Sequence, residues 1–253
     1  ILVGKATRLA QFLDKDKKEY VADVQFGFET DTGDRTGSRT ADCGLRIEEI
    51  AGKLKLVTWD DLLAKFRGEI LQTPPMYSAK KIEGKKLYEL ARQGIEVDRK
   101  PVKVVIHELE LLTAEIREPQ SAIRMRVVCS AGTYIRTLAE DIGRELGVGA
   151  HLTDLRRTKA GQFGLGESAS LEDLESSTAP DLLSIDLAVS HLAEFQLTAD
   201  RVEKTRSGLS THVDGNRFEA GEHVRMTSGE GDLVAVGIYD DDEKTIRPKV
   251  VLI

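Results

Sequence analysis

The sequence has few cysteines and no long apolar run. No stretch of about 18 apolar residues occurs, so no membrane-crossing helix is expected. The chain has two cysteines in 253 residues, Cys43 and Cys129, and neither has a Cys or His neighbour at a metal-ligand spacing. No H-x-x-x-H pair occurs among the histidines, and no basic segment precedes an apolar one as in a signal peptide. We therefore expect a cytoplasmic protein with reduced thiols, no metal and no membrane partner.

Several catalytic motifs are also absent. The chain has no P-loop, no G-x-G-x-x-G, no G-x-S-x-G and no H-E-x-x-H. Kinases, dinucleotide-dependent dehydrogenases, serine hydrolases of that type and zinc proteases each need one of these motifs. The residues alone thus indicate a protein that works without a cofactor.

The net charge of −7, from 36 basic and 43 acidic residues, argues at first against a nucleic-acid partner. However, residues 160–200 contain eight acidic residues and no Lys or Arg. Without this segment the count is 36 basic against 43 − 8 = 35 acidic residues, a balance of +1. A polyanion-binding face is therefore admissible if the remaining basic clusters share one surface.

The pattern of apolar residues predicts an α+β fold. Alternation predicts strands over 18–28, 102–112, 122–130 and 151–163, and the second and third of these are expected to pair. Helical spacing and capping residues predict helices over 4–14, 59–66, 85–93 and 134–146. The order of these elements shows no regular βαβ repeat, which favours an α+β layer over a doubly wound sheet.

The pattern of predicted elements changes near residue 193. Short strands with Gly- and Asp-rich turns follow a short helix there, which predicts a small β-rich domain over 193–253. We expect one larger domain over 1–192, in which 160–192 forms an acidic connector. The opening Ile1-Leu2-Val3 is typical of the end of a buried strand, so the larger domain is expected to be incomplete at its start.

Four strings contain residues that could carry chemistry. Tyr20, in K-K-E-Y, could stack on a base, although a strand Tyr packed on the core is the commoner outcome. In C-S-A-G-T-Y-I-R, Tyr134 could contact a ligand, and Arg136 could hold a carboxylate or phosphate with its planar fork. The alternative is an ordinary helix start with a surface arginine.

The other two strings are basic. Leu155-Arg156-Arg157 places two arginines beside an apolar residue, which suits phosphate contacts, although a solvated charge run is the plainer interpretation. The string P-P-M-Y-S-A-K-K joins a rigid turn to a cluster of lysines and suits contacts with an RNA backbone better than catalysis.

Taken in order, these strings and their neighbours resemble one family. The series comprises V-G-K-A-T-R-L (3–9), K-K-E-Y (17–20), F-G-x-E-T-D-T-G-D (26–34), F-R-G-E-I (66–70), P-P-M-Y-S-A-K-K-x-x-G-K-K-L-Y-E-L-A-R-Q-G (74–94), C-S-A-G-T-Y-I-R-T-L (129–138) and G-A-H-L-T-D-L-R-R-T (149–158). It is similar to the bacterial TruB family of tRNA pseudouridine-55 synthases over most of residues 1–175. The C-terminal part resembles, more loosely, the family's small PUA-like RNA-binding domain.

The resemblance implies a fold and a reaction. It implies a pseudouridine synthase core with a mixed or antiparallel sheet, flanking helices and a cleft. The enzyme would isomerise one uridine in the T loop of tRNA, position 55, without cofactor or metal. The base would be flipped out of its stack, an Asp would attack the nucleotide, and the uracil would rejoin the sugar through carbon. We expect a monomer whose partner is the tRNA T-arm.

The resemblance also assigns roles to residues. Tyr20 matches the tyrosine that stacks on the flipped uracil, Tyr134 a pocket tyrosine suited to take the C5 proton, and Arg136 the arginine that pairs with the catalytic Asp. Leu155 matches a pocket leucine, and Asp31 lies on the family's T-D-T loop and would join the polar network. Phosphates of the tRNA would be held by Lys80, Lys81, Lys85, Lys86, Arg156 and Arg157.

One departure from the family pattern affects activity. The family's nucleophile lies in a G-x-L-D-x-x-A-x-G motif ahead of V-G-x-A-T, and this sequence does not contain that motif. Asp14 and Asp16 lie in the wrong context to replace it. We therefore expect a pseudouridine synthase that is inactive as residues 1–253 alone. The alternatives are a tRNA-binding or tRNA-folding protein without chemistry, and an unrelated α+β domain.

Overall fold

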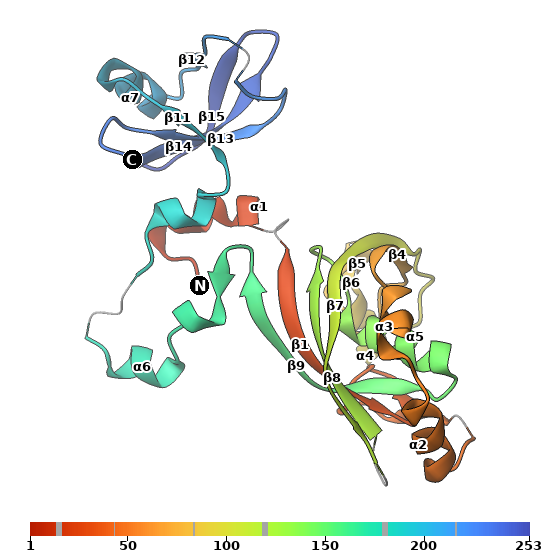
Figure 1. The fold of residues 1–253 in the computed structure, drawn as a ribbon. Helices are drawn as coiled ribbons and strands as arrows, with labels where there is room; N and C mark the ends of the chain where they lie inside the picture. The colour runs from red at the N-terminus through yellow and green to blue at the C-terminus, as the bar shows by residue number, and fades with distance from the viewer. Residues whose placement is uncertain (14–16, 43, 83, 118–120, 179–181, 216) are drawn as a thin grey trace. The chain divides into compact units, whose positions relative to one another are not determined.

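A computed structural model describes residues 1–13, 17–42, 44–82, 84–117, 121–178, 182–215 and 217–253. Contacts along the chain group its residues into two compact units, one of Asp16–Ser168 and one of Ile1–Lys15 with Ala169–Ile253 (Figure 1). This grouping differs from a boundary at residue 192, which stays a prediction. Within the described residues, no helix is long and apolar enough to span a membrane.

The Asp16–Ser168 unit is built on a six-stranded sheet. Its order is β10 (Phe163–Gly164), β9 (Ala150–Ala160), β1 (Lys18–Phe26), β8 (Ser121–Cys129), β7 (Val102–Ile116) and β4 (Gly68–Gln72), and every neighbouring pair is antiparallel. A short hairpin of β2 (Phe28–Thr30) and β3 (Arg39–Asp42) follows β1. The predicted α+β fold and the predicted pairing of the strands over 102–112 and 122–130 are confirmed.

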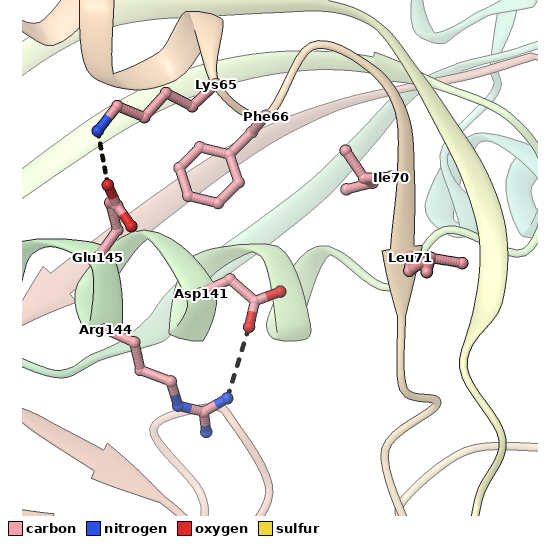
Figure 2. A pocket seen from close by; sticks show the side chains of 7 residues that line it. All are labelled: Lys65, Phe66, Ile70, Leu71, Asp141, Arg144 and Glu145. Atoms are coloured by element: carbon pink, nitrogen blue, oxygen red, sulfur yellow. Dashed lines mark hydrogen bonds and ion pairs between the residues drawn. The ribbon is translucent and has the colours of Figure 1, made fainter.

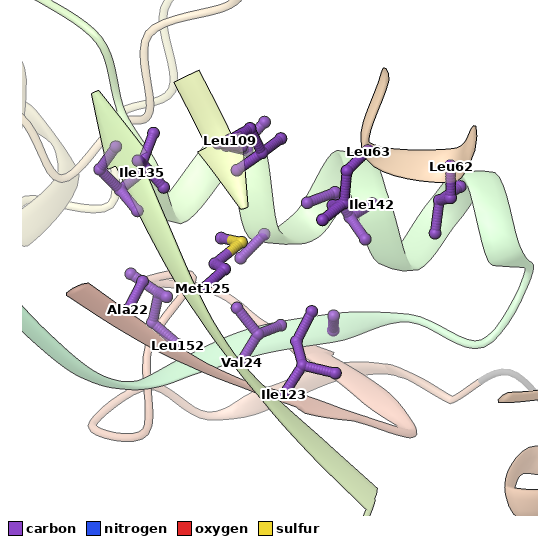
Figure 3. Close-up of a cluster of buried hydrophobic side chains, with 14 of the residues drawn as sticks. Ala22, Val24, Leu62, Leu63, Leu109, Ile123, Met125, Ile135, Ile142 and Leu152 are labelled. Carbon is purple, nitrogen blue, oxygen red and sulfur yellow. The ribbon is translucent and has the colours of Figure 1, made fainter. Parts of the chain in front are cut away.

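Helices cover one face of this sheet. They are α2 (Ile47–Lys55), α3 (Trp59–Ala64) and α5 (Ile135–Leu146) (Figure 1). Ala22 and Val24 of β1 lie in the same buried cluster as Met125 of β8, Leu63 of α3 and Ile142 of α5 (Figure 3). Because strand residues alternate between faces, the even-numbered positions of β1 face this core and the odd-numbered ones face away.

Helix α5 lies very close to β9. A Cβ added to Gly143 would lie 2.4 Å from the main-chain nitrogen of Ala150, a distance that only glycine at this position permits. The helix ends at Gly147, which adopts the left-handed conformation with φ of 64°. Gly143 therefore sets the close contact between α5 and β9, and Gly147 sets the end of α5. Together they define where the first turn of α5 lies over the sheet.

A basic excursion leaves the sheet between β4 and β7. We call residues 73–101 the basic arm. It contains β5 (Lys81–Ile82), β6 (Lys85–Lys86) and α4 (Leu87–Arg92). The helix predicted to begin at Lys85 begins at Leu87, because Lys85 and Lys86 pair with β5 instead.

The second unit contains a five-stranded sheet. Its order is β11 (Ala193–Gln196), β13 (His223–Thr227), β14 (Leu233–Asp240), β15 (Thr245–Val251) and β12 (Thr211–His212), with α7 (Ala199–Arg206) beside it. The remaining elements are η1 (Gly4–Leu9), α1 (Ala10–Leu13), α6 (Leu171–Ser176) and η3 (Ile185–Val189), while η2 (Leu165–Glu167) follows β10 in the first unit. The β-rich character predicted for 193–253 is confirmed.

Two smaller predictions have other outcomes. Residues 1–3, expected as the end of a buried strand, form no strand, and Ile1 and Val3 are exposed because no described strand pairs with them. Cys129 is a free and buried thiol, and burial raises its pKa. Cys43 lies outside the described residues, as do Asp14 and Asp16.

Candidate active site

The helix-covered face of the sheet presents Tyr20 next to Leu155. Tyr20 of β1 packs against the buried core that α5 covers. Its partner on β9 is Arg157, while Leu155 lies opposite Ala22, and directly opposed residues of an antiparallel pair share a face. Leu155 is 39% exposed, so its side chain is accessible to a ligand on this face. The structure therefore brings Tyr20, Leu155 and Arg157 together on one side of the sheet.

The start of α5 supplies Tyr134 and Arg136. Strand β8 ends at Cys129, a turn follows, and Tyr134 is the N-terminal capping residue of α5 with extended φ and ψ of −102° and 104°. The Gln72 side chain bonds to the main chain of Tyr134 on both sides: Nε2 donates to the carbonyl oxygen at 3.2 Å, and Oε1 accepts from the amide at 3.0 Å. These two bonds hold the main chain of Tyr134 from the end of β4. Tyr134 itself is half-buried.

Arg136 is paired with a carboxylate that the sequence analysis did not single out. Its Nη2 lies 2.7 Å from Oδ2 of Asp34, in the loop between β2 and β3. The loop is attached to β9, since Arg35 donates to the carbonyl of Leu152 at 2.8 Å and Leu152 donates to that of Gly33 at 3.0 Å. The ion pair thus joins the first turn of α5 to a loop that is itself fixed on the sheet.

The loop holds Asp34 in its ionised form. Burial opposes the charge, but hydrogen bonds from the hydroxyl and amide of Thr36, a bond from Thr32 and the positive charge of Arg136 outweigh it and lower the pKa of Asp34. The Thr36 hydroxyl and amide lie 2.6 and 3.0 Å from Oδ1, so Oδ2 is left to Arg136. The result is a fixed, charged acceptor for the arginine.

A second group of charges lies one and two turns along α5. Arg144 binds Glu29 of β2 through two bonds of 2.8 and 2.9 Å and lies 3.5 Å from Glu140. A Cβ on Gly33, where φ is +71°, would lie 2.7 Å from Oε1 of Glu140. Burial raises the pKa of Glu140 to about 7 against the attraction of Arg144, so this carboxyl titrates near neutral pH.

Asp31 and Arg156 were predicted as site residues, but their contacts and positions differ from those of the other predicted residues. Asp31 donates its amide to Ser38 and accepts the Ser38 amide at 2.8 Å, so the contacts shown for it hold the loop together. Arg156 lies opposite Val21 and Arg157 opposite Tyr20, so the two arginines point to opposite faces of the sheet. Only Arg157 shares the face of the predicted pocket.

The lysines of the basic arm are concentrated on its hairpin. Lys81 lies directly opposite Lys86 across the β5–β6 pair, and Lys85 lies opposite Ile82. Like charges in directly opposed positions are unfavourable in isolation. Lys86 is partly compensated by Glu89 at 4.0 Å and by the Tyr88 hydroxyl at 3.2 Å. Lys81 and Lys86 therefore place two positive charges at opposed positions of the hairpin, and Lys80 and Lys85 are their neighbours along the chain.

The clearest hollows in this unit lie outside the predicted site. One, of about 460 Å³, is bounded by Phe66, Ile70 and Leu71 on one side and by charged residues of α5 on the other (Figure 2). A second, of about 580 Å³, lies between the β2–β3 hairpin and α2. Neither hollow is lined by Tyr20, Tyr134, Arg136 or Leu155, so neither is part of the candidate site.

Two residues of the site were missed by sequence reasoning. Asp34 stands three residues after Asp31 in a turn-rich loop, and the threonines spaced around it (Thr30, Thr32 and Thr36) were the available signal. Gln72 is a polar residue on the buried side of a strand, with an exposed fraction of 1%. A buried amide requires hydrogen-bond partners, but the sequence offers no indication that Tyr134 is one of them.

Comparison with known proteins identifies the family. The profile described as "TruB family pseudouridylate synthase (N terminal domain)" matches residues 1–135, and that described as "tRNA pseudouridylate synthase B C-terminal domain" matches residues 136–183. The chain belongs to the TruB family. The predicted family is thereby confirmed, and the two matches meet at the first residues of α5.

Curated relatives of the TruB family match nearly the whole chain. The tRNA pseudouridine synthase B of Aromatoleum aromaticum is 44% identical over 253 residues, which cover 98% of this chain and 77% of the relative. Those of Solibacter usitatus and Aquifex aeolicus are each 40% identical, over 94% and 100% of this chain and 80% and 84% of the respective relatives.

Solved structures show the same fold. A Cbf5-Nop10-Gar1 complex contains a chain that matches with a TM-score of 0.67 and 25% identity, over 99% of this chain and 71% of the other. An H/ACA RNP bound to a substrate RNA containing 2'-deoxyuridine matches with a TM-score of 0.68 and 22% identity, over 99% and 70%. The pseudouridine synthase architecture expected from the sequence is confirmed.

Proposed function

We propose that this protein isomerises the uridine at position 55, in the T loop of tRNA, to pseudouridine. One observation carries the proposal: Tyr20 and Leu155 lie side by side on the sheet face over which α5 begins with Tyr134 and Arg136. A tyrosine and a leucine provide a surface on which a flipped base can stack. The relatives named tRNA pseudouridine synthase B support tRNA as the substrate.

Each residue has a proposed role. Tyr20 stacks on the flipped uracil, and Leu155 supplies an apolar contact. Tyr134 takes the C5 proton once the uracil has rejoined the sugar through carbon. Arg136, held by Asp34, orients the nucleophilic Asp that the family's G-x-L-D-x-x-A-x-G motif provides. That motif does not occur in residues 1–253, and we propose that these residues bind tRNA without turning it over unless the motif is supplied.

The basic arm and Arg157 are the proposed contacts with tRNA phosphates. Lys81 and Lys86 lie opposite each other, and a phosphate bound between them would lower the repulsion between their charges. Arg157 adds a cation on the pocket face itself. Such contacts position the T-arm without reading its sequence. We propose that the protein acts as a monomer.

A binding experiment and an activity experiment test the proposal. The chain should bind a T-arm stem-loop with an affinity that falls as salt rises, and a version carrying the G-x-L-D segment ahead of Ile1 should form pseudouridine in the T loop. If the extended protein binds tRNA and forms no pseudouridine, the alternative of a tRNA-binding or tRNA-folding protein is favoured. Salt-insensitive or undetectable binding by a folded chain contradicts both.

A further inference from the structure

The buried side-chain amide of Gln72 forms hydrogen bonds with one residue through both its nitrogen and its oxygen. Its side chain is 1% exposed, and it donates to the carbonyl and accepts from the amide of Tyr134. This is the pairing that a neighbouring strand would give to a main-chain segment. Tyr134 receives it from a side chain because it lies between the end of β8 and the start of α5, outside any strand.

The turn around Tyr134 also has local bonds: the Thr133 hydroxyl donates to the Ser130 carbonyl at 2.8 Å, and the Leu138 amide donates to the Tyr134 carbonyl at 3.1 Å. Gln72 is the partner of the Tyr134 amide. The side chain of Tyr134 forms no capping hydrogen bond with α5. Ser130, at the start of the turn, is held by β7, since its hydroxyl accepts the Val105 amide at 3.0 Å and its amide donates to the Val105 carbonyl at 2.8 Å. Gln72 performs the same task at the far end of the turn. The main chain from Ser130 to Tyr134 is therefore fixed at both ends by neighbouring strands.

Gln72 is also the residue at which the basic arm leaves the sheet. It is the last residue of β4 and pairs with Val102, the first residue of β7, so the whole arm lies between these two positions. The neck is closed by Arg99, which donates to the Pro74 carbonyl at 3.2 Å. The residue that holds Tyr134 is therefore also one of the two residues at which the arm joins the sheet.

We propose that Gln72 is a positioning residue: it sets the main chain of Tyr134 for the flipped uridine. This inference rests on the proposed function, because it assumes that Tyr134 contacts the target base. An apolar residue at position 72 would leave the amide and carbonyl of Tyr134 without these partners. An ionised glutamate would accept from the amide but could not donate to the carbonyl.

The test measures the preference of the chain for a target base. Two T-arm stem-loops are compared, one with uridine at the target position and one abasic there, and the ratio of their dissociation constants reports the base contact alone. We expect the wild-type chain to prefer the uridine RNA by about tenfold or more. In Gln72→Met the ratio should fall toward one. Affinity for the abasic RNA and its salt dependence should change little, because the lysines are intact.

Two further variants separate positioning from a general loss of structure. Leu71→Ala is the matched control, because Leu71 is the neighbour of Gln72 on β4 and is 65% exposed; its ratio should equal that of the wild type. In Gln72→Glu, a change of pH alone can restore the lost hydrogen bond to Tyr134, because protonation gives the carboxyl a donor. The protonated carboxyl has one donor and one acceptor, so the preference for uridine should be present at about pH 5 and lost at about pH 8, a step absent from the wild type.

The outcomes distinguish the inference from the proposed function. A wild-type chain without preference for uridine overturns the proposed base pocket, and the role of Gln72 falls with it. A wild-type preference that persists in Gln72→Met, or in Gln72→Glu at every pH, overturns the role of Gln72 alone. If Gln72→Met does not fold, as judged by near-ultraviolet circular dichroism, the pH series of Gln72→Glu decides the question.

Discussion

Arg136 and Asp34 form an ion pair with 2.7 Å between Nη2 and Oδ2, and this pair connects the helix that begins the candidate site to the loop after β2. The side chain of Asp34 is 17% exposed and that of Arg136 is 39% exposed, so the carboxylate is shielded from solvent more than the guanidinium. The position of the pair explains why a loop far from α5 in the sequence belongs to the site.

Replacing Asp34 with Asn should destabilise the protein at neutral pH. Asn can still accept the Thr36 bonds, but it loses the charge paired with Arg136, which is worth about 1–3 kcal/mol for a bond between charged groups. Because the folded-state pKa of Asp34 is lowered from 3.8, its contribution is complete above that pH and disappears as pH falls through the folded-state value. Urea unfolding of both proteins across pH measures this.

The control for Asp34 is Asp31→Asn, on the same loop but without contact to Arg136 among the bonds described here. Its effect on the free energy of unfolding should be smaller at neutral pH. A difference between wild type and Asp34→Asn that stays constant below pH 3.8 would show that the carboxylate charge does not contribute.

Glu140 should have the opposite pH dependence. Burial raises its pKa from 4.5 to about 7, so its stabilising contribution is complete below 4.5 and is lost as pH rises through about 7. Glu140→Gln removes this loss. Relative to wild type, the variant should gain stability between about pH 4 and pH 9 by at most about 3 kcal/mol, at 1.36 kcal/mol for each unit of pKa.

Chemical unfolding of Glu140→Gln at these two pH values is the measurement, and Glu145→Gln is its matched control. Glu145 lies on the same helix but its side chain is 44% exposed and paired with Lys65, so its substitution should show no comparable gain at high pH. An equal gain in both variants would mean that the charge of α5 as a whole, rather than the burial of Glu140, causes the effect.

Arg157 and Arg156 should differ in their effect on RNA binding. Arg157 lies on the face of Tyr20, and Arg156 lies on the opposite face beside Val21. Arg157→Gln should weaken T-arm binding and reduce the dependence of log Kd on log salt by about one, as expected for the loss of one phosphate contact. Arg156→Gln should leave both unchanged. Equal losses from the two variants would contradict the assignment of the pocket to the α5-covered face.

Tyr20 should contribute to base binding and not to phosphate binding. Tyr20→Ala removes a ring worth about 1–3 kcal/mol of stacking for one base. Affinity for a T-arm with the target uridine should fall by this amount, whereas affinity for the abasic T-arm should hardly change. Because Tyr20 also packs on the core, Tyr20→Leu serves as the control for packing and should lose base affinity while keeping the fold. Equal losses for both RNAs would make Tyr20 a scaffold residue.

The sequence was a good guide wherever one periodic pattern decides the structure. The paired strands β7 and β8 and the helix α5 follow from apolar residues at strand or helix spacing, because burial on one face fixes the element. Strand β13 lies in the segment predicted to be β-rich. The ends of the elements were predicted less well. Thr58 precedes α3 as predicted from its capping propensity, yet its side chain forms no capping bond there.

The parts that escaped prediction depend on contacts between distant segments. Asp34 reaches Arg136 only because its loop is bonded to Leu152 of β9, over a hundred residues away along the chain. Gln72 and Tyr134 meet through the order of strands in the sheet, which no local pattern specifies. The separation of Arg156 and Arg157 depends on the register and bulges of the β1–β9 pair. Each of these facts requires the tertiary structure.

Mapping of pseudouridine in a tRNA transcript is the decisive measurement of the proposed activity. The protein carrying the G-x-L-D segment ahead of Ile1 is incubated with unmodified tRNA, and pseudouridine is located by carbodiimide treatment and reverse transcription. The account predicts one new pseudouridine, at position 55 in the T loop, which is absent when the Asp of the added motif is replaced by Asn. A protein that binds the tRNA but forms no pseudouridine, or forms it only outside the T loop, would contradict the account.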